Sequence, residues 1–123
     1  MLKIAHSAIY AHSLPEGHRF PMLKYELIPE QLLHEGSINP NHLFVPESCT
    51  ASDLLLTHDL AYYQRLIHLQ LSSSEQRVIG FPQSEELIMR EHIITQGTIE
   101  ALVEPILPWT ARFDIGGPDV ESL

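Results

Sequence analysis

The sequence predicts a helix-rich α/β fold that contains a small sheet. Three observations lead to this prediction. An apolar segment with β-branched residues opens the chain, and three later segments repeat apolar residues at steps of three and four. Prolines, glycines and serines separate these segments. The chain has 123 residues, 44% of them hydrophobic, which is enough for one compact domain.

The first strand is predicted at Leu2–Ala8, because this apolar segment is followed by a Pro-Glu-Gly turn signal. A helix is predicted to follow at Met22–Glu35, where apolar residues recur at helical spacing. Pro21 suits the first helical position, and Gly36 is expected to end the helix. Pro29 lies inside the pattern, so a kink or a break is expected there.

The middle of the chain is predicted to hold short elements. A short strand is possible at His42–Val45, and TASDLLLT (residues 50–57) predicts one short helix. A second helix is predicted at Asp59–Leu71, which carries an apolar face. The serines at 72–74 are expected to end that helix, and RVIGFP (residues 77–82) is expected to be extended.

The last long helix is predicted at Ser84–Val103, with Ser84 as its cap and two glutamates in its first turn. Two prolines follow and should end it. Residues 1–104 are therefore assigned to one domain, and residues 105–123 to a C-terminal tail. That tail is expected to hold at most one short strand, around Ala111–Ile115.

Composition excludes several classes of protein. The formal net charge is −9, and the seven basic residues are scattered, which argues against a nucleic-acid partner. No stretch is long and apolar enough to predict a membrane span, and the first residues do not form a secretory signal. Cys49 is the only cysteine, so the sequence predicts no intrachain disulfide and a reducing, cytoplasmic location.

The sequence predicts no metal site and no nucleophilic catalytic centre. Eight histidines are present, but no His-Glu-x-x-His or Asp-x-His pattern joins them, so no metal ligands and no catalytic residues are assigned. No Gly-x-Ser-x-Gly motif occurs. Cys49 is interpreted as a small residue at a helix entry rather than a nucleophile. Tyr62 and Tyr63 are expected to pack in the core rather than bind a ligand.

One loop is chemically unusual. PEGHRFPMLKY (residues 15–25) places two prolines, a glycine and the adjacent pair His18 and Arg19 in front of a predicted helix. It could be a plain connector between strand and helix, with both side chains solvated.

The order of motifs resembles the N-terminal portion of bacterial members of the histone deacetylase superfamily, the acetoin utilisation or acetylpolyamine amidohydrolase group. The resemblance rests on LPEGHRFPMLKYELIPEQLLHEG, LLLTHDLAYYQRL, SSSEQRVIGFPQSEELIMRE and TQGTIEA, and it extends over residues 2–103. PEGHRFPM and RVIGFPQS are its most specific parts. The resemblance implies the three-layer arginase/deacetylase fold, of which this chain would be a fragment.

The resemblance also implies a function, which is zinc-dependent hydrolysis of acyl-lysine or acetylpolyamine amides. His18 and Arg19 match positions that line the substrate and product channel, and Arg19 matches an arginine of the inner cavity. The family's His-His pair, Asp-x-His motif, further Asp and catalytic Tyr do not appear in this sequence, and residues 105–123 do not match the family. The chain is therefore expected to be truncated and inactive by itself, without zinc, which a full-length relative would bind.

Two other functions remain open at this point. The chain could be a non-catalytic, self-associating remnant, or a small binding module that uses its helical surface. If the sheet of the larger fold is missing, its strand edge and apolar helix faces would be exposed, so a homo-oligomer is expected, joined through the first strand or the last helix.

Overall fold

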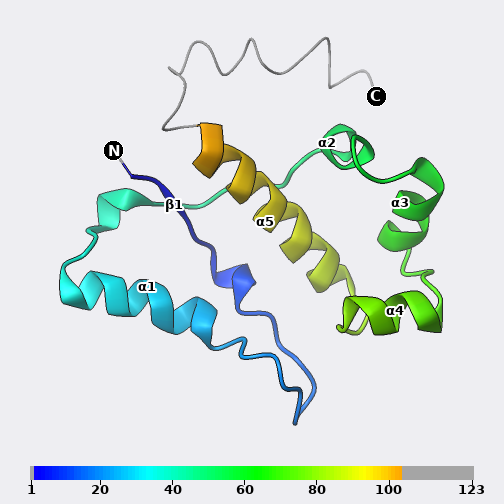
Figure 1. Ribbon diagram of the computed structural model, residues 1–123, viewed down its shortest axis with the longest axis horizontal. Coiled ribbons are helices and arrows are strands. Elements are labelled where there is room, and N and C mark those ends of the chain that lie inside the picture. The colour runs from blue at the N-terminus through cyan, green and yellow to red at the C-terminus, as the bar shows by residue number, and fades with distance from the viewer. Residues whose placement is uncertain (1, 104–123) are drawn as a thin grey trace.

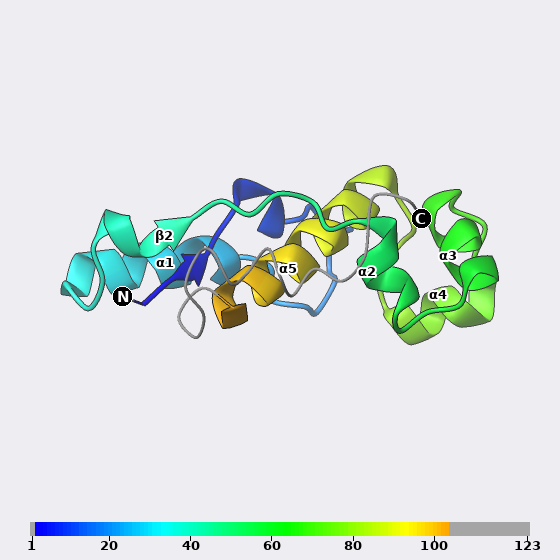
Figure 2. The ribbon, with the colours of Figure 1, turned by 90° about the horizontal axis from the view of Figure 1, so that it is seen from above.

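A two-stranded sheet lies beside helix α5 (Glu85–Val103) in the computed structural model, which describes residues 2–103 (Figure 1). Helix α5 lies between α1 at one end of the molecule and α3 and α4 at the other (Figure 2). The predicted helix-rich α/β class is confirmed at this level, while the predicted strand at Ala111–Ile115 lies outside the described residues. The elements in chain order are β1 (Ile4–Ala5), the 3-10 turn η1 (Ala8–Tyr10), α1 (Lys24–Glu35), the 3-10 turn η2 (Pro40–His42), β2 (Leu43–Phe44), α2 (Ala51–Leu55), α3 (Leu60–Ile67), α4 (Ser73–Ile79) and α5 (Glu85–Val103).

The sheet is parallel and very short. Ile4 pairs with Leu43 and Ala5 with Phe44, which confirms the strand expected at His42–Val45. The first strand is shorter than the predicted Leu2–Ala8, because its partner β2 has only two residues and the turn η1 begins at Ala8.

Helix α1 continues through Pro29, so the predicted break is wrong there. Pro29 lies in the second turn and removes only one backbone hydrogen bond. The helix ends as predicted at Gly36, whose φ of 77° is left-handed and whose N–H donates to the carbonyls of Leu32 and Leu33.

The prediction for residues 72–82 is wrong in part. The serines end no long helix, because α3 already stops at Ile67, and Ser72 instead begins α4. The Ser72 side chain accepts the Glu75 N–H, and the Glu75 side chain accepts the Ser72 N–H, so each satisfies a free donor at the start of the helix. Residues 77–79, predicted to be extended, are therefore helical, and Gly80 ends α4 with a φ of 85°.

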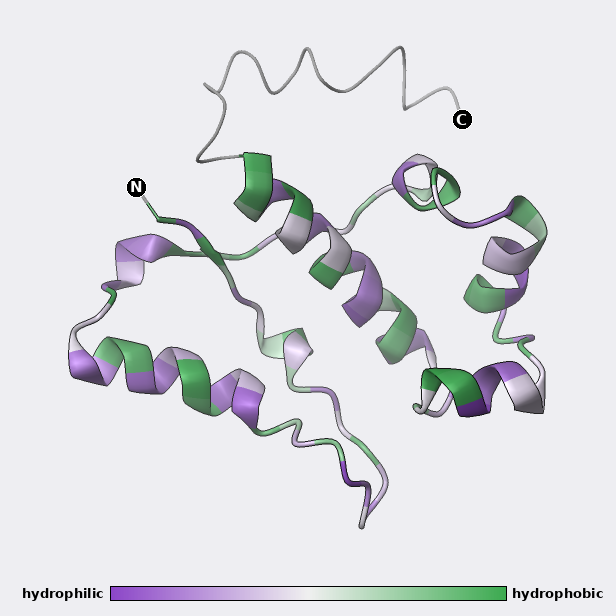
Figure 3. Ribbon diagram, viewed as in Figure 1, coloured by the Kyte–Doolittle hydropathy of each residue, from purple (hydrophilic) through white to green (hydrophobic). Residues whose placement is uncertain are grey.

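Helix α5 begins where it was predicted. The Leu87 N–H donates to Ser84 Oγ at 3.0 Å, which makes Ser84 the expected cap. Apolar and polar residues alternate along both α5 and α1 (Figure 3). Among the described helices, none is both long and apolar enough to cross a bilayer.

Few side chains are deeply buried. In residues 2–103 the buried hydrophobic residues are Tyr10, Ile38, Cys49, Leu71 and Leu87, and none of the large side chains is less than 2% exposed. The described residues thus form a thin core for their number.

Candidate functional site

The two motifs most specific for the resemblance, PEGHRFPM and RVIGFPQS, meet in space. The loop between η1 and α1 brings His18 to the connection between α4 and α5. His18 Nε2 donates to the Gly80 carbonyl at 2.8 Å, and the Phe20 N–H donates to His18 Nδ1 at 3.2 Å. The tip of the loop is therefore attached to a backbone 62 residues away in sequence.

Aromatic rings complete this contact. The His18 ring is stacked on Phe81 with centroids 5.5 Å apart, and Phe20 meets Phe81 edge-on at 5.2 Å. Lys24 places its ammonium 4.8 Å from the centroid of the Phe20 ring. The loop is consequently packed through its aromatic residues, while its charged groups stay at the surface.

A surface hollow of about 580 Å³ lies at this contact. The loop residues 17–21 form one wall, and Ile79, Gly80 and Phe81 form the other. Arg19 lies on its rim and is exposed, rather than enclosed in an inner cavity. No other residue of the described range 2–103 forms a hydrogen bond or an ion pair with its guanidinium, so Arg19 can bind an external anion.

Arg90 holds both ends of the loop, and sequence reasoning missed it. Its side chain is only 3% exposed. Nε donates to the Tyr10 carbonyl at 2.9 Å, before the loop, and Nη2 lies 3.7 Å from the Met22 sulfur, after it. The guanidinium also lies over the Tyr25 ring at 5.0 Å and pairs with the Glu91 carboxylate. The available signal was the position of Arg90 three residues after Leu87, on the buried face of α5.

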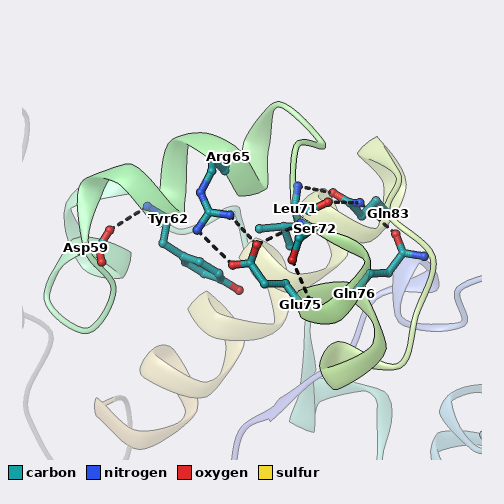
Figure 4. Close-up of polar contacts among 8 residues, drawn as sticks. All are labelled: Asp59, Tyr62, Arg65, Leu71, Ser72, Glu75, Gln76 and Gln83. Atoms are coloured by element: carbon teal, nitrogen blue, oxygen red, sulfur yellow. Dashed lines mark hydrogen bonds and ion pairs between the residues drawn. The ribbon is translucent and has the colours of Figure 1, made fainter.

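Gln83 was also missed, and it fixes the connection between α3 and α4 (Figure 4). Its Oε1 accepts the Leu71 N–H at 2.9 Å, and its Nε2 donates to the Leu71 carbonyl at 3.1 Å and to Gln76 Oε1 at 2.9 Å. Both backbone groups of the buried residue Leu71 are thereby satisfied by one amide. The RVIGFPQS motif therefore has a structural role in addition to its contact with the loop.

An ion pair joins α3 to α4 beside this amide. Arg65 donates from both terminal nitrogens to the Glu75 carboxylate, and the second of these bonds measures 3.0 Å (Figure 4). The Arg65 guanidinium, followed by the Ser72 N–H, lowers the pKa of Glu75 to about 2. This carboxyl group is therefore charged throughout the neutral range.

Cys49 does not have the environment of a nucleophile. The residue is buried, and its N–H donates to the His92 carbonyl at 3.1 Å. Burial raises the pKa of the Cys49 thiol, and the nearby Asp53 carboxylate raises it further, so the thiol stays protonated at neutral pH. Thr50 directly follows as the cap of α2, which confirms the interpretation of Cys49 as a residue at a helix entry.

The buried His92 and the half-buried Tyr63 form a pair next to Cys49. His92 Nδ1 donates to the Ile88 carbonyl at 2.7 Å, and the Tyr63 hydroxyl lies 3.3 Å from His92 Nε2. Burial raises the pKa of Tyr63. The pair thus serves the packing of α3 on α5, as expected for Tyr63. Within residues 2–103, no three His, Cys, Asp or Glu side chains come together in a way that could hold a metal ion.

The fold and this site define a helix-rich protein with a small parallel sheet and a loop that presents an arginine at a surface hollow. No family model matches the sequence. The chain is similar to an uncharacterized protein of Picosynechococcus sp. strain PCC 7002, with 34% identity over 90 residues. These residues are 73% of this chain and 30% of that protein, so the chain spans less than a third of the length of this relative.

Proposed function

We propose that residues 2–103 are the N-terminal portion of a zinc-dependent deacetylase-like hydrolase, with the arginase/deacetylase fold, that acts on acyl-lysine or acetylpolyamine amides. The observation that carries the proposal is the contact of PEGHRFPM with RVIGFPQS through His18, Gly80 and Phe81. Both motifs resemble the same family, and their separation in sequence gives no local reason for them to touch. A shared site explains why both are present in one chain.

In this proposal the described residues provide a wall of the site and an anion-binding group. Arg19 is the group suited to a carboxylate, because its guanidinium donates in a planar fork and is not engaged by the rest of the described chain. The described residues do not fit zinc, since they contain no cluster of metal ligands. Zinc and the residues that activate water would therefore have to come from outside residues 2–103.

The test is a chimera of the Picosynechococcus protein in which the 90 aligned residues are replaced by those of this chain. After loading with zinc, both the parent and the chimera should hydrolyse an acetyl-lysine peptide or an acetylated polyamine. Arg19→Gln in the chimera should lower turnover by about tenfold or more, because a preorganised charge at the site is lost.

Arg77→Gln is the matched control, since Arg77 is an exposed arginine whose hydrogen bonds within the described residues stay inside α4. It should leave turnover unchanged. A zinc-loaded, folded parent and chimera that hydrolyse neither substrate class would refute the proposal.

Self-association is a second candidate function, because the described residues leave many large hydrophobic side chains exposed. Leu2, Met89 and Leu102 are at least 57% exposed, and they lie next to the first strand or on α5. Exposed apolar side chains that gather on one element form a surface that another protein chain can cover.

A further inference from the structure

His18 forms a bridge across Arg19 that depends on the protonation state of its ring. Nδ1 accepts the N–H of Phe20, so Nδ1 carries no proton. Nε2 lies 2.8 Å from the Gly80 carbonyl, which has no hydrogen to donate, so Nε2 carries the proton. The two contacts exist together only in the neutral imidazole with its hydrogen on Nε2.

Other histidines of the chain show that this arrangement is specific. His68 Nδ1 lies 2.7 Å from the Gln64 carbonyl and therefore carries a proton, so a second proton on its Nε2 leaves this bond in place. His42 Nδ1 accepts the Asn39 N–H, as His18 does for Phe20, but within the turn η2. Among these three residues, only His18 also joins two distant segments.

The described residues that line the hollow beside His18 carry no negative charge. Among the described residues that line the hollow, Arg19, a cation, is the only other ionisable side chain. From α1, Lys24 brings another cation against the Phe20 ring. The connection between α4 and α5 contributes Gly80 and Phe81, neither of which can be ionised. A hydrogen on Nδ1 would point at the Phe20 N–H, and no carboxylate among the residues lining the hollow would compensate.

We propose that neutral His18 is a positioning residue that holds Arg19 at the hollow, and that protonation of His18 releases Arg19. The bridge from the His18 ring to the Phe20 N–H fixes the backbone on both sides of Arg19, and the Gly80 contact anchors this bridge to the α4–α5 connection. Adding a proton breaks the bond to Phe20, while the bond to Gly80 can remain. Anion binding by Arg19 is therefore weaker when His18 carries its second proton than when its ring is neutral.

Nuclear magnetic resonance on the native chain tests this proposal without any assay of hydrolysis. At pH 8 the ring of His18 should be the tautomer with hydrogen on Nε2. The protection factor of the Phe20 amide against hydrogen exchange should be about tenfold lower at pH 5 than at pH 8, because one hydrogen bond is lost. The comparison is made after correction for the intrinsic effect of pH on exchange. The Phe20 signal should move together with the His18 ring signals.

Two variants sharpen the test. His18→Phe keeps a ring on Phe81 but has no nitrogen, so its Phe20 amide should be weakly protected at both pH values. His42→Gln is the matched control and should retain the native pH dependence at Phe20. Two results would overturn the proposal: a hydrogen on Nδ1 of His18 at pH 8, or equal protection of the Phe20 amide at pH 5 and pH 8. Both are measured on the native chain, so the test does not depend on the folding of His18→Phe.

Discussion

At Gly97, helix α5 passes the first strand so closely that a side chain of even one carbon has no room. A Cβ at this position would lie 2.9 Å from the Ala5 Cβ, 3.2 Å from the Pro46 ring and 2.7 Å from the Tyr10 hydroxyl. The Ala5 Cβ is attached directly to the backbone of β1 and cannot rotate away. Gly97 therefore sets the distance between α5 and the sheet, and with it the position of Arg90 beneath the loop.

Gly97→Ala should destabilise the chain, even though alanine is the better helix former by about 1 kcal/mol. Overpacking against β1 costs about 1–3 kcal/mol, so we expect a net loss of about 1–2 kcal/mol in the free energy of unfolding. Urea denaturation followed by circular dichroism measures it. Thr98→Ala, at an exposed position of the same helix, should change the free energy by less than about 0.5 kcal/mol. Equal stability of Gly97→Ala and the native chain would mean that α5 can move away from the sheet at no cost.

Three side-chain contacts, rather than an extensive apolar interface, join α3 to α4. The Gln83 side chain satisfies the backbone groups of Leu71. Ser72 and Glu75 cap each other, and Arg65 forms an ion pair with Glu75. Glu75 takes part in two of these contacts. The position of α4, and of Gly80 and Phe81 that follow it, consequently depends on the charge of one carboxyl group.

Glu75→Gln should remove a pH-dependent part of the stability. The pKa of Glu75 is lowered from 4.5 to about 2 in the folded chain. The carboxylate therefore contributes its full stabilisation above pH 4.5, and loses it as the pH falls towards 2. Glutamine can still accept the Ser72 N–H, so the variant isolates the ion pair.

Urea midpoints of the native chain and Glu75→Gln should differ at pH 7 and converge as the pH is lowered from 5 to 3. Glu30→Gln, at an exposed position of α1, is the control and should not show this convergence. A difference between the native chain and Glu75→Gln that stays constant with pH would show that the ion pair contributes nothing to stability.

Across residues 2–103, large hydrophobic side chains are exposed at many positions outside the thin core. The sheet has only two strands, whereas parallel sheets are usually larger and covered on both faces. The large hydrophobic side chains exposed among the described residues are Leu2, Leu23, Leu27, Ile28, Val45, Leu56, Leu60, Leu69, Val78, Ile79, Met89, Ile99 and Leu102. Leu2 precedes the first strand, and Met89, Ile99 and Leu102 lie on α5. The first strand and α5 are the two elements expected to mediate association.

We predict that the purified chain forms a homo-oligomer, most simply a two-fold dimer, through the first strand or α5. Sedimentation velocity from about 1 to about 100 μM, a range that covers micromolar dissociation constants, should show a mass above 14.0 kDa. Leu102→Glu should weaken association, because it buries a charge in the interface. Val78→Glu, on α4 and 87% exposed, should not. A monomer at every concentration would contradict the prediction.

Much of the local structure was predictable, because its causes lie within a few residues. Gly36, Asp59 and Ser84 end or begin helices through hydrogen bonds to their own neighbours, and these signals were interpreted correctly. The same kind of signal was present in Ser72 and Glu75, where a capping box was taken for a turn. Local signals could not predict the length of the first strand, because a strand extends only as far as the partner strand that it pairs with, and this partner is distant in sequence.

For the candidate site, the sequence by itself determined which residues are chemically unusual. The pair His18 and Arg19 stands out in its loop, and helical periodicity identifies the face of α5 on which Arg90 lies. Only the tertiary structure decided that His18 bonds to Gly80, that Arg90 bonds to a carbonyl 80 residues away, and that Arg19 is left without a partner among the described residues. The physical reason is that periodicity and capping act over one or two turns, whereas these contacts depend on how closely α5 approaches the first strand.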